Sequence, residues 1–89
     1  MNNSGMAEAI ATAKVAVQNI YEDEKLTDMD VEEVEWDSED WLITLGFTSS
    51  KTKQIIGGLT IPNRRLRRVR VDRQTGAFKG MTRAPTREG

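Results

Sequence analysis

The side chains of this chain that could do chemistry are its carboxylates and its arginines, because the sequence contains no histidine and no cysteine. Nucleophilic catalysis by Ser–His or Cys–His pairs is therefore excluded, as are metal sites built from imidazole or thiolate ligands. A pair of carboxylates could still act as acid and base. The acidic residues, however, crowd on predicted strand faces and turns, where charges are usually solvated. We therefore expect a protein that is not an enzyme and that uses no cofactor.

One candidate cluster of carboxylates consists of Asp37, Glu39 and Asp40. Carboxylate oxygens are the ligands that Ca²⁺ prefers, but this segment has neither the length nor the glycine of a calcium loop. A short break rich in Asp and Ser between two alternating segments is typical of a hairpin turn. We expect a turn here and no metal site.

The closest spacing of basic residues is RRLRRVR at positions 64–70. Such a strand could contact the phosphates of a nucleic acid, or it could pair with acids on a neighbouring strand. Two observations disfavour nucleic acid: the sequence pI is about 5.4, and no aromatic residue is interleaved with the arginines.

The charges are strongly segregated along the chain. Up to Thr48 there are twelve acidic and two basic residues, and from Ser49 onward there are eleven basic and two acidic residues. This asymmetry indicates either a charged partner or two halves of the chain that lie against each other.

Apolar residues recur at helical spacing near the N-terminus. They predict one buried face of a helix over residues 6–21. The residues of this stripe are Met6, Ile10, Ala13, Val17 and Ile20.

The period then changes to two, which predicts strands over residues 31–37, 41–47, 65–73 and 77–82, with loop up to about Met29. Trp36 and Trp41 alternate in phase with apolar positions, so we expect them to pack in the core or across strands. Asp72 and Gly76 predict a hairpin loop between the last two strands.

These elements predict an α+β fold, with one N-terminal helix packed on a three- to four-stranded antiparallel meander sheet. We expect a flexible N-terminus at residues 1–5, a single domain at 6–83 and a flexible C-terminal tail at 84–89. In a meander, the acidic and the basic strand flank the central one. Glu and Arg side chains could then meet over Thr44 and Gly46.

The segment between the second and third predicted strands, residues 49–63, is long for a connection in a compact domain. Such a segment is usually functional, mobile, or an extra strand that was missed. It begins with polar residues and continues as IIGGLTIP. We interpret it as a long loop and leave open whether it forms an extra strand.

The order of helix, acidic strand, Trp-rich central strand and VRVDRQTGAFKGM resembles that of PepSY-like domains, which often end in a V-x-V-D-x-x-T-G hairpin and one more strand. The resemblance covers about residues 7–81 and implies a cystatin-like, non-catalytic module of the kind associated with protease inhibition or with sensing at the cell envelope. The matching residues are Val69, Val71, Asp72, Thr75 and Gly76.

We therefore expect a small protein-binding module, either an inhibitor or an accessory factor of a larger assembly, that uses the 49–63 loop and a charged sheet face. The alternative is a nucleic-acid-binding accessory protein that uses the strand Arg64–Arg73, and a homodimer is a further alternative. We expect a cytoplasmic protein, because no leader or membrane-spanning segment is recognisable. The predicted partner-binding residues are Ile55, Ile56, Leu59, Ile61, Arg65, Arg67, Arg68 and Arg70.

Overall fold

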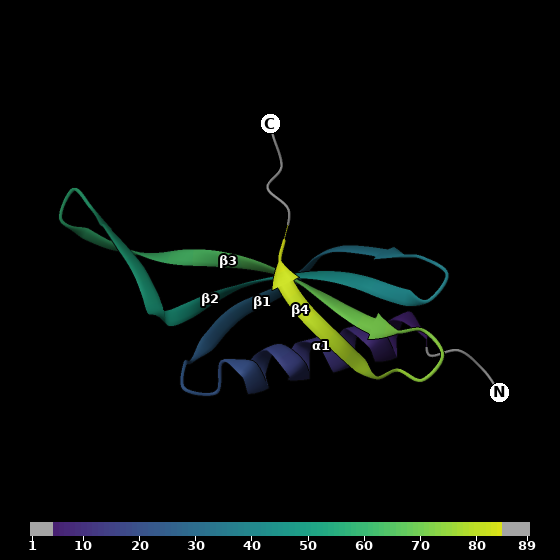
Figure 1. Cartoon of the computed structure of the whole chain (residues 1–89). Helices are drawn as coiled ribbons and strands as arrows, with labels where there is room; N and C mark the ends of the chain where they lie inside the picture. Colours follow the sequence, from purple (N-terminus) through teal and green to yellow (C-terminus); the bar gives the residue numbers. More distant parts are fainter. Residues whose placement is uncertain (1–4, 85–89) are drawn as a thin grey trace.

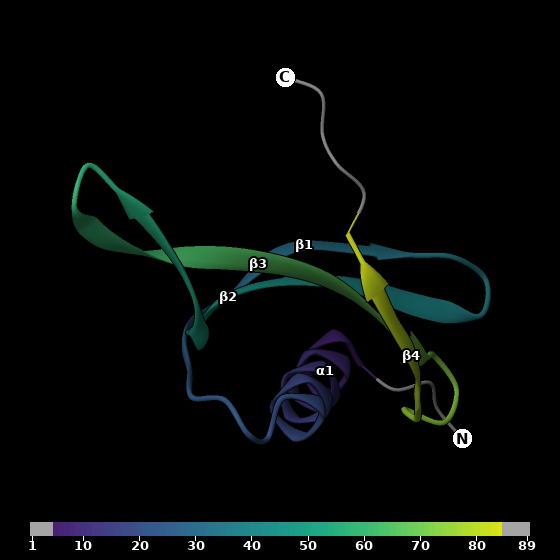
Figure 2. The same ribbon diagram turned by 60° about the vertical axis from the view of Figure 1, so that its left-hand side comes forward.

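The computed structural model describes residues 5–84, and for residues 50–56 and 60–63 it describes the backbone alone. One helix is followed by four strands, which form a single antiparallel sheet in the order β1-β2-β3-β4. Helix α1 lies against one face of the sheet, and no element of residues 5–84 covers the other face (Figure 1, Figure 2). The predicted α+β fold is confirmed. The elements are α1 (Met6–Ile20), β1 (Leu26–Trp36), β2 (Asp40–Ile56), β3 (Leu59–Asp72) and β4 (Phe78–Arg83).

The core lies between α1 and the two central strands. The alternation in β2 buries Ile43, Leu45 and Phe47 on the face toward α1, as predicted. Small alanines on the helix allow its backbone to come close to the sheet. The remaining buried apolar residues are Ala9, Ala13 and Val17 of α1 and Val69 and Val71 of β3.

The predicted apolar stripe of the helix is only partly buried. Ala13 and Val17 are buried, whereas Met6 and Ile20 are about half exposed. These two residues lie in the first and last turns of α1, and the buried contact is centred on the turns between them. The expectation that the whole stripe packs on the sheet was therefore wrong at both ends.

Strand β1 begins at Leu26, earlier than the predicted start at residue 31. Leu26 pairs with Ser49, and the pairing continues to Trp36 opposite Trp41, with two register shifts on the way. Asp28 lies at the first shift and has a φ of 54°. This irregularity breaks the strict alternation of side chains, so periodicity did not reveal the first residues of the strand.

The expected loop at residues 49–63 is not a loop. Strands β2 and β3 continue through it as an antiparallel ribbon, from Lys53 opposite Pro62 to Ile56 opposite Leu59. Gly57 and Gly58, with φ of 59° and 83°, make the two-residue turn, which needs two left-handed residues. We call residues 50–63 the arm. It projects beyond the rest of the sheet, at the left of both views (Figure 1, Figure 2).

The two tryptophans meet across β1 and β2, with ring centroids 6.1 Å apart. The predicted cross-strand contact is confirmed, and Trp41 packs against the core. Trp36 is 62% exposed, so of the two expected kinds of packing it has the cross-strand one. It lies on the edge strand β1, whereas its register partner Trp41 lies on β2, one of the two strands that form the core.

Candidate functional site

The face of the sheet that α1 leaves uncovered carries a set of ion pairs across all four strands. We call it the charged face. Its paired residues are Asp30, Glu32, Glu35, Asp40, Arg64, Arg68, Arg70 and Lys79.

On the charged face, the side chain of Arg64 (β3) crosses the middle of β2 and pairs with acids of β1. Its guanidinium lies 2.9 Å from a Glu32 oxygen and 3.2 Å from an Asp30 oxygen. A Cβ atom at Gly46 would lie 2.7 Å from Glu32 Oε2 and 2.8 Å from Arg64 Nη2. Gly46 therefore leaves the space in which this ion pair crosses β2, which confirms the prediction that acids and arginines meet there.

A second ion pair between β3 and β1 crosses β2 at Thr44. Arg68 Nη2 lies 3.7 Å from Glu35 Oε1. Thr44, the register partner of Arg68, is almost completely buried although α1 lies on the other face. Long charged side chains thus shield this part of the central strand from water, with their aliphatic stems over it.

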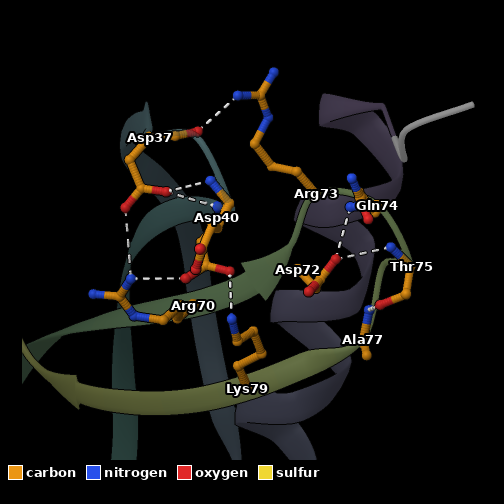
Figure 3. Close-up of polar contacts among 10 residues, drawn as sticks. Asp37, Asp40, Arg70, Asp72, Arg73, Gln74, Thr75, Ala77 and Lys79 are labelled. Atoms are coloured by element: carbon orange, nitrogen blue, oxygen red, sulfur yellow. Dashed lines mark hydrogen bonds and ion pairs between the residues drawn. The ribbon is translucent and has the colours of Figure 1, made fainter.

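Asp40 is the most buried charge of the face, with only 4% of its side chain exposed. Its Oδ1 accepts a hydrogen bond from Lys79 Nζ at 2.9 Å and its Oδ2 accepts one from Arg70 Nη1 at 2.8 Å. Figure 3 shows the two cations reaching Asp40 from β3 and β4. The bonds from Lys79 and then Arg70 hold the pKa of Asp40 below its ordinary value of 3.8, while the same contacts raise the pKa of both cations.

The two turns beside Asp40 are closed by aspartates. Asp37 Oδ1 accepts the backbone N–H groups of Glu39 and Asp40 at 2.8 and 2.7 Å, and these bonds lower its pKa. Asp72 Oδ1 accepts those of Gln74 and Thr75 at 2.7 and 2.9 Å (Figure 3), with the same effect on its pKa. Both predicted turns are confirmed.

The surroundings of Asp40 are unfavourable for acid–base chemistry. A carboxylate with both oxygens bound to cations, and with a lowered pKa, is a poor proton donor or acceptor near neutral pH. Within residues 5–84, no group of three or more acidic side chains is placed to hold a metal ion.

The predicted basic surface is divided by the alternation of β3. Arg68 and Arg70 lie on the charged face, whereas Arg65 and Arg67 lie on the side of α1. The guanidinium of Arg65 lies 5.4 Å from the centre of the Tyr21 ring, and Arg67 Nε donates to Tyr21 Oη at 3.0 Å. The structure therefore does not bring the four predicted partner-binding arginines together on one face.

The predicted apolar residues of the arm are brought together at its end. Ile55 faces Thr60, Ile56 faces Leu59, and Ile61 faces Gln54 in the backbone register. Leu59 is 68% exposed. The side chains of Ile55, Ile56 and Ile61 lie outside the described residues.

An apolar groove between α1 and β4 was not predicted. It has a volume of about 500 Å³, and Val15 (53% exposed), Ile20 and Phe78 are its large apolar residues. One signal was present in the sequence, since Val15 lies off the predicted apolar stripe of the helix and so had no place in the core. The remaining lining residues are Ala11, Thr12, Ala16 and Asn19.

Within the described part of the chain, no helix is long and apolar enough to cross a membrane. Neither a scan against protein-family models nor searches of curated proteins and of solved structures found a match to this chain.

Proposed function

We propose that this chain is a small, non-catalytic protein-binding module, an inhibitor or accessory factor of a larger assembly, that engages its partner through the arm. One observation carries the proposal: in residues 5–84, the pairing of β1 with β2 ends at Ser49 and that of β4 with β3 ends at Arg67. Beyond these points the arm strands pair only with each other. Each therefore presents a row of backbone donors and acceptors to which a partner strand can add.

The other sheet edges are less suited to strand addition. Strand β1 carries five acidic residues and two register shifts, and β4 is only six residues long and carries Lys79 and Arg83. Charges, irregularities and short length are the usual means by which an edge is protected from pairing. The arm has no acidic residue, and its apolar residues are concentrated near the turn. These differences support the arm as the binding element.

The charged face contributes less to binding than its composition suggested. Arg64, Arg68 and Arg70 each have a carboxylate within 4 Å, so their charge is largely balanced inside the molecule. The same pairing weakens the alternative of a nucleic-acid-binding protein, because phosphates would have to displace these acids. The resemblance to PepSY-like domains is consistent with a non-catalytic binding module, and membership of that family is part of the proposal.

The proposal is tested by shortening the arm without changing the register. Replacing residues 55–60 by Asn-Gly makes Gln54 and Ile61, which face each other, the residues that flank a two-residue turn. In quantitative pull-downs from the native cell extract, we expect the wild-type chain to enrich a defined partner that the shortened chain loses. Arg68→Gln is the matched control, since it changes the charged face and leaves the arm intact. If the shortened chain, with unchanged thermal stability, captures the same partner, the arm is not the binding element.

The nucleic-acid alternative has its own test. At low salt we expect no mobility shift of single- or double-stranded probes at micromolar protein concentrations. A shift whose affinity falls steeply as salt increases would favour the alternative over the present proposal.

A further inference from the structure

Most arginines of β3 have a carboxylate oxygen within 4 Å of the guanidinium. These matched arginines are Arg64, Arg65, Arg68 and Arg70. Arg67 is the exception: among residues 5–84, no carboxylate lies within that distance of its guanidinium, which contacts only Tyr21 and the backbone of Leu66. The charge of Arg67 is therefore not balanced by an acid in this part of the chain.

Arg67 also lies directly opposite a second arginine, Arg83 of β4. Residues that face each other in an antiparallel pair project from the same face of the sheet, with Cβ atoms about 5 Å apart, and like charges in such a pair are destabilising. Arg83 is exposed, and it too has no carboxylate within ion-pair distance among residues 5–84. The register thus holds two positive charges side by side, and an anion bound between them would relieve their repulsion.

The hydroxyl of Tyr21 adds a third hydrogen-bond donor beside the two arginines. It accepts a hydrogen bond from Arg67 Nε at 3.0 Å, and Arg67 Nη1 donates to the carbonyl oxygen of Leu66 at 2.8 Å. These two bonds orient the guanidinium and leave its Nη2 without a protein partner among the described residues. The Tyr21 hydroxyl is the acceptor in its contact, so its own proton also has no acceptor there. Oriented donors are thus available to a ligand.

We propose that Tyr21, Arg67 and Arg83 form a binding site for a phosphate group, either inorganic phosphate or a phosphate monoester. Charge favours phosphate over a carboxylate: a monoester carries about −1.5 to −2 at pH 7 and balances both guanidinium groups, whereas a carboxylate balances only one. The three acceptor oxygens of a monoester also equal the donor groups in number. The site lies outside the arm and goes beyond the function proposed above.

A structural role for the two arginines is the competing explanation. Tyr21 is the C-cap residue of α1, and the end of a helix carries partial negative charge that nearby cations stabilise without any ligand. The acids that follow Tyr21, Glu22 and Asp23, are exposed and form no ion pair with Arg67 or Arg83 in the described residues. If the role is structural, Arg83→Gln lowers the thermal midpoint equally in phosphate and in chloride. If phosphate binds, the wild type is stabilised by phosphate and the variant is not.

The test titrates the purified full-length protein with inorganic phosphate at pH 7 and at constant ionic strength, balanced with chloride. We expect saturable changes in the side-chain NMR resonances of Arg67 and Arg83. Arg83→Gln should weaken binding at least about tenfold, because it removes a charge-assisted contact. Arg68→Gln removes the same charge from the other face of the sheet and should change the affinity less than about twofold, since distant exposed charges are screened. Tyr21→Phe keeps the ring, removes the hydroxyl and should weaken binding severalfold.

Two further measurements identify the ligand. The affinity for phosphate should rise between pH 5.5 and pH 7, because the second pKa of phosphate groups lies near 6. The chain has no histidine, so the ordinary pKa values of its side chains lie outside this range. The peptide Gly-phosphoserine-Gly, used in place of inorganic phosphate, distinguishes the sources. Tighter binding of the peptide indicates a phosphorylated partner, tighter binding of inorganic phosphate indicates a small ligand, and equal binding means that the phosphate group alone is recognised.

Three results would overturn the inference. The first is acetate binding as tightly as phosphate at the same ionic strength, and the second is an equal loss of affinity in Arg68→Gln and Arg83→Gln. The third is an oligonucleotide without a terminal phosphate that binds more tightly than inorganic phosphate and the phosphopeptide, since its diester groups carry one charge each. Shortening the arm leaves Tyr21, Arg67 and Arg83 in place, so this proposal and the proposed function can fail separately.

Discussion

One face of the sheet packs against α1 through buried apolar side chains, whereas the other carries ion pairs between strands, two of which cross β2. Strand β2 contributes side chains to both faces, and they are buried on each: Leu45 is fully buried toward α1, and Thr44 is almost completely buried on the charged face. Apolar burial and ion pairing contribute different amounts to the free energy of unfolding. Burial of a large apolar side chain contributes several kcal/mol, whereas an exposed ion pair contributes about 1 kcal/mol at most.

The comparison suggests a division of tasks between the two faces. The apolar face supplies the stability of the domain. The charged face sets which strands lie beside each other, because acids of β1 meet arginines of β3 across β2 only in this order and register. Four predictions test this division, from the largest expected effect to the smallest.

Phe47→Ala should unfold the domain or nearly so. Phe47 is fully buried and its ring centroid lies 5.4 Å from that of Tyr21. Such truncations cost about 3–5 kcal/mol, comparable with the whole stability of a chain of this size. Urea denaturation followed by circular dichroism measures the loss. Phe78→Ala, at a half-exposed phenylalanine, is the control and should have little effect on stability. Equal losses for the two variants would contradict the assignment of the core.

Asp40→Asn should be the most destabilising single change on the charged face. The neutral amide leaves Arg70 and Lys79 without the carboxylate that holds both of them. We expect the thermal midpoint to fall by several degrees, measured by circular dichroism at neutral pH. Asp30→Asn, at an exposed partner of Arg64, serves as the matched control and should change the midpoint very little. A larger fall of the midpoint for Asp30→Asn would show that the burial of a carboxylate does not determine how much its ion pair contributes to stability.

Acid should destabilise the domain through the same groups. The pKa values of Asp37, Asp40 and Asp72 lie below 3.8 in the folded chain, so the unfolded chain binds protons first as the pH falls. The stability that these carboxylates provide is complete above their ordinary pKa, and it is lost as the pH falls from about 4 through their folded pKa values. Thermal midpoints between pH 7 and pH 2 measure this loss, and Asp40→Asn should show a shallower decline. An equally steep decline in the variant would show that protonation of Asp40 does not contribute to the loss of stability in acid.

Gly46→Ala should have the smallest effect. The added methyl group meets the mobile ends of Glu32 and Arg64, so these side chains move apart and the backbone keeps its place. We expect a loss below about 1 kcal/mol, and a smaller loss in an Arg64→Gln background, where the pair is already broken. Denaturation of the four proteins of this double-mutant cycle gives the coupling. A loss of the same size in both backgrounds would mean that Gly46→Ala destabilises the domain through the backbone and not through the Glu32–Arg64 pair.

Much of the fold could be predicted from local patterns. The alternation of Ile43, Leu45 and Phe47, the aspartates of the two turns and the flanking of the central strand by opposite charges all appear in the structure as expected. The arm was interpreted as a loop, with an extra strand left open, because polar and apolar residues do not alternate in this segment of the sequence. Its Gly57-Gly58 turn was the one local signal that it offered.

The candidate binding surfaces were less predictable. The period of two in β3 divides Arg65, Arg67, Arg68 and Arg70 between the two faces, and only the structure shows that Arg65 and Arg67 contact Tyr21. The α1–β4 groove involves Val15 and Phe78, which are more than sixty residues apart in the chain. Only packing brings them together.

By itself, the sequence determined the types of the elements, the apolar side of each strand and the absence of imidazole and thiolate chemistry, because these follow from residue type and local periodicity. The tertiary structure decided which charges neutralise each other, which backbone edges stay unpaired and where an apolar surface is left exposed. These properties depend on register and on the placement of the helix across the sheet, and both are set by contacts between residues distant in the chain.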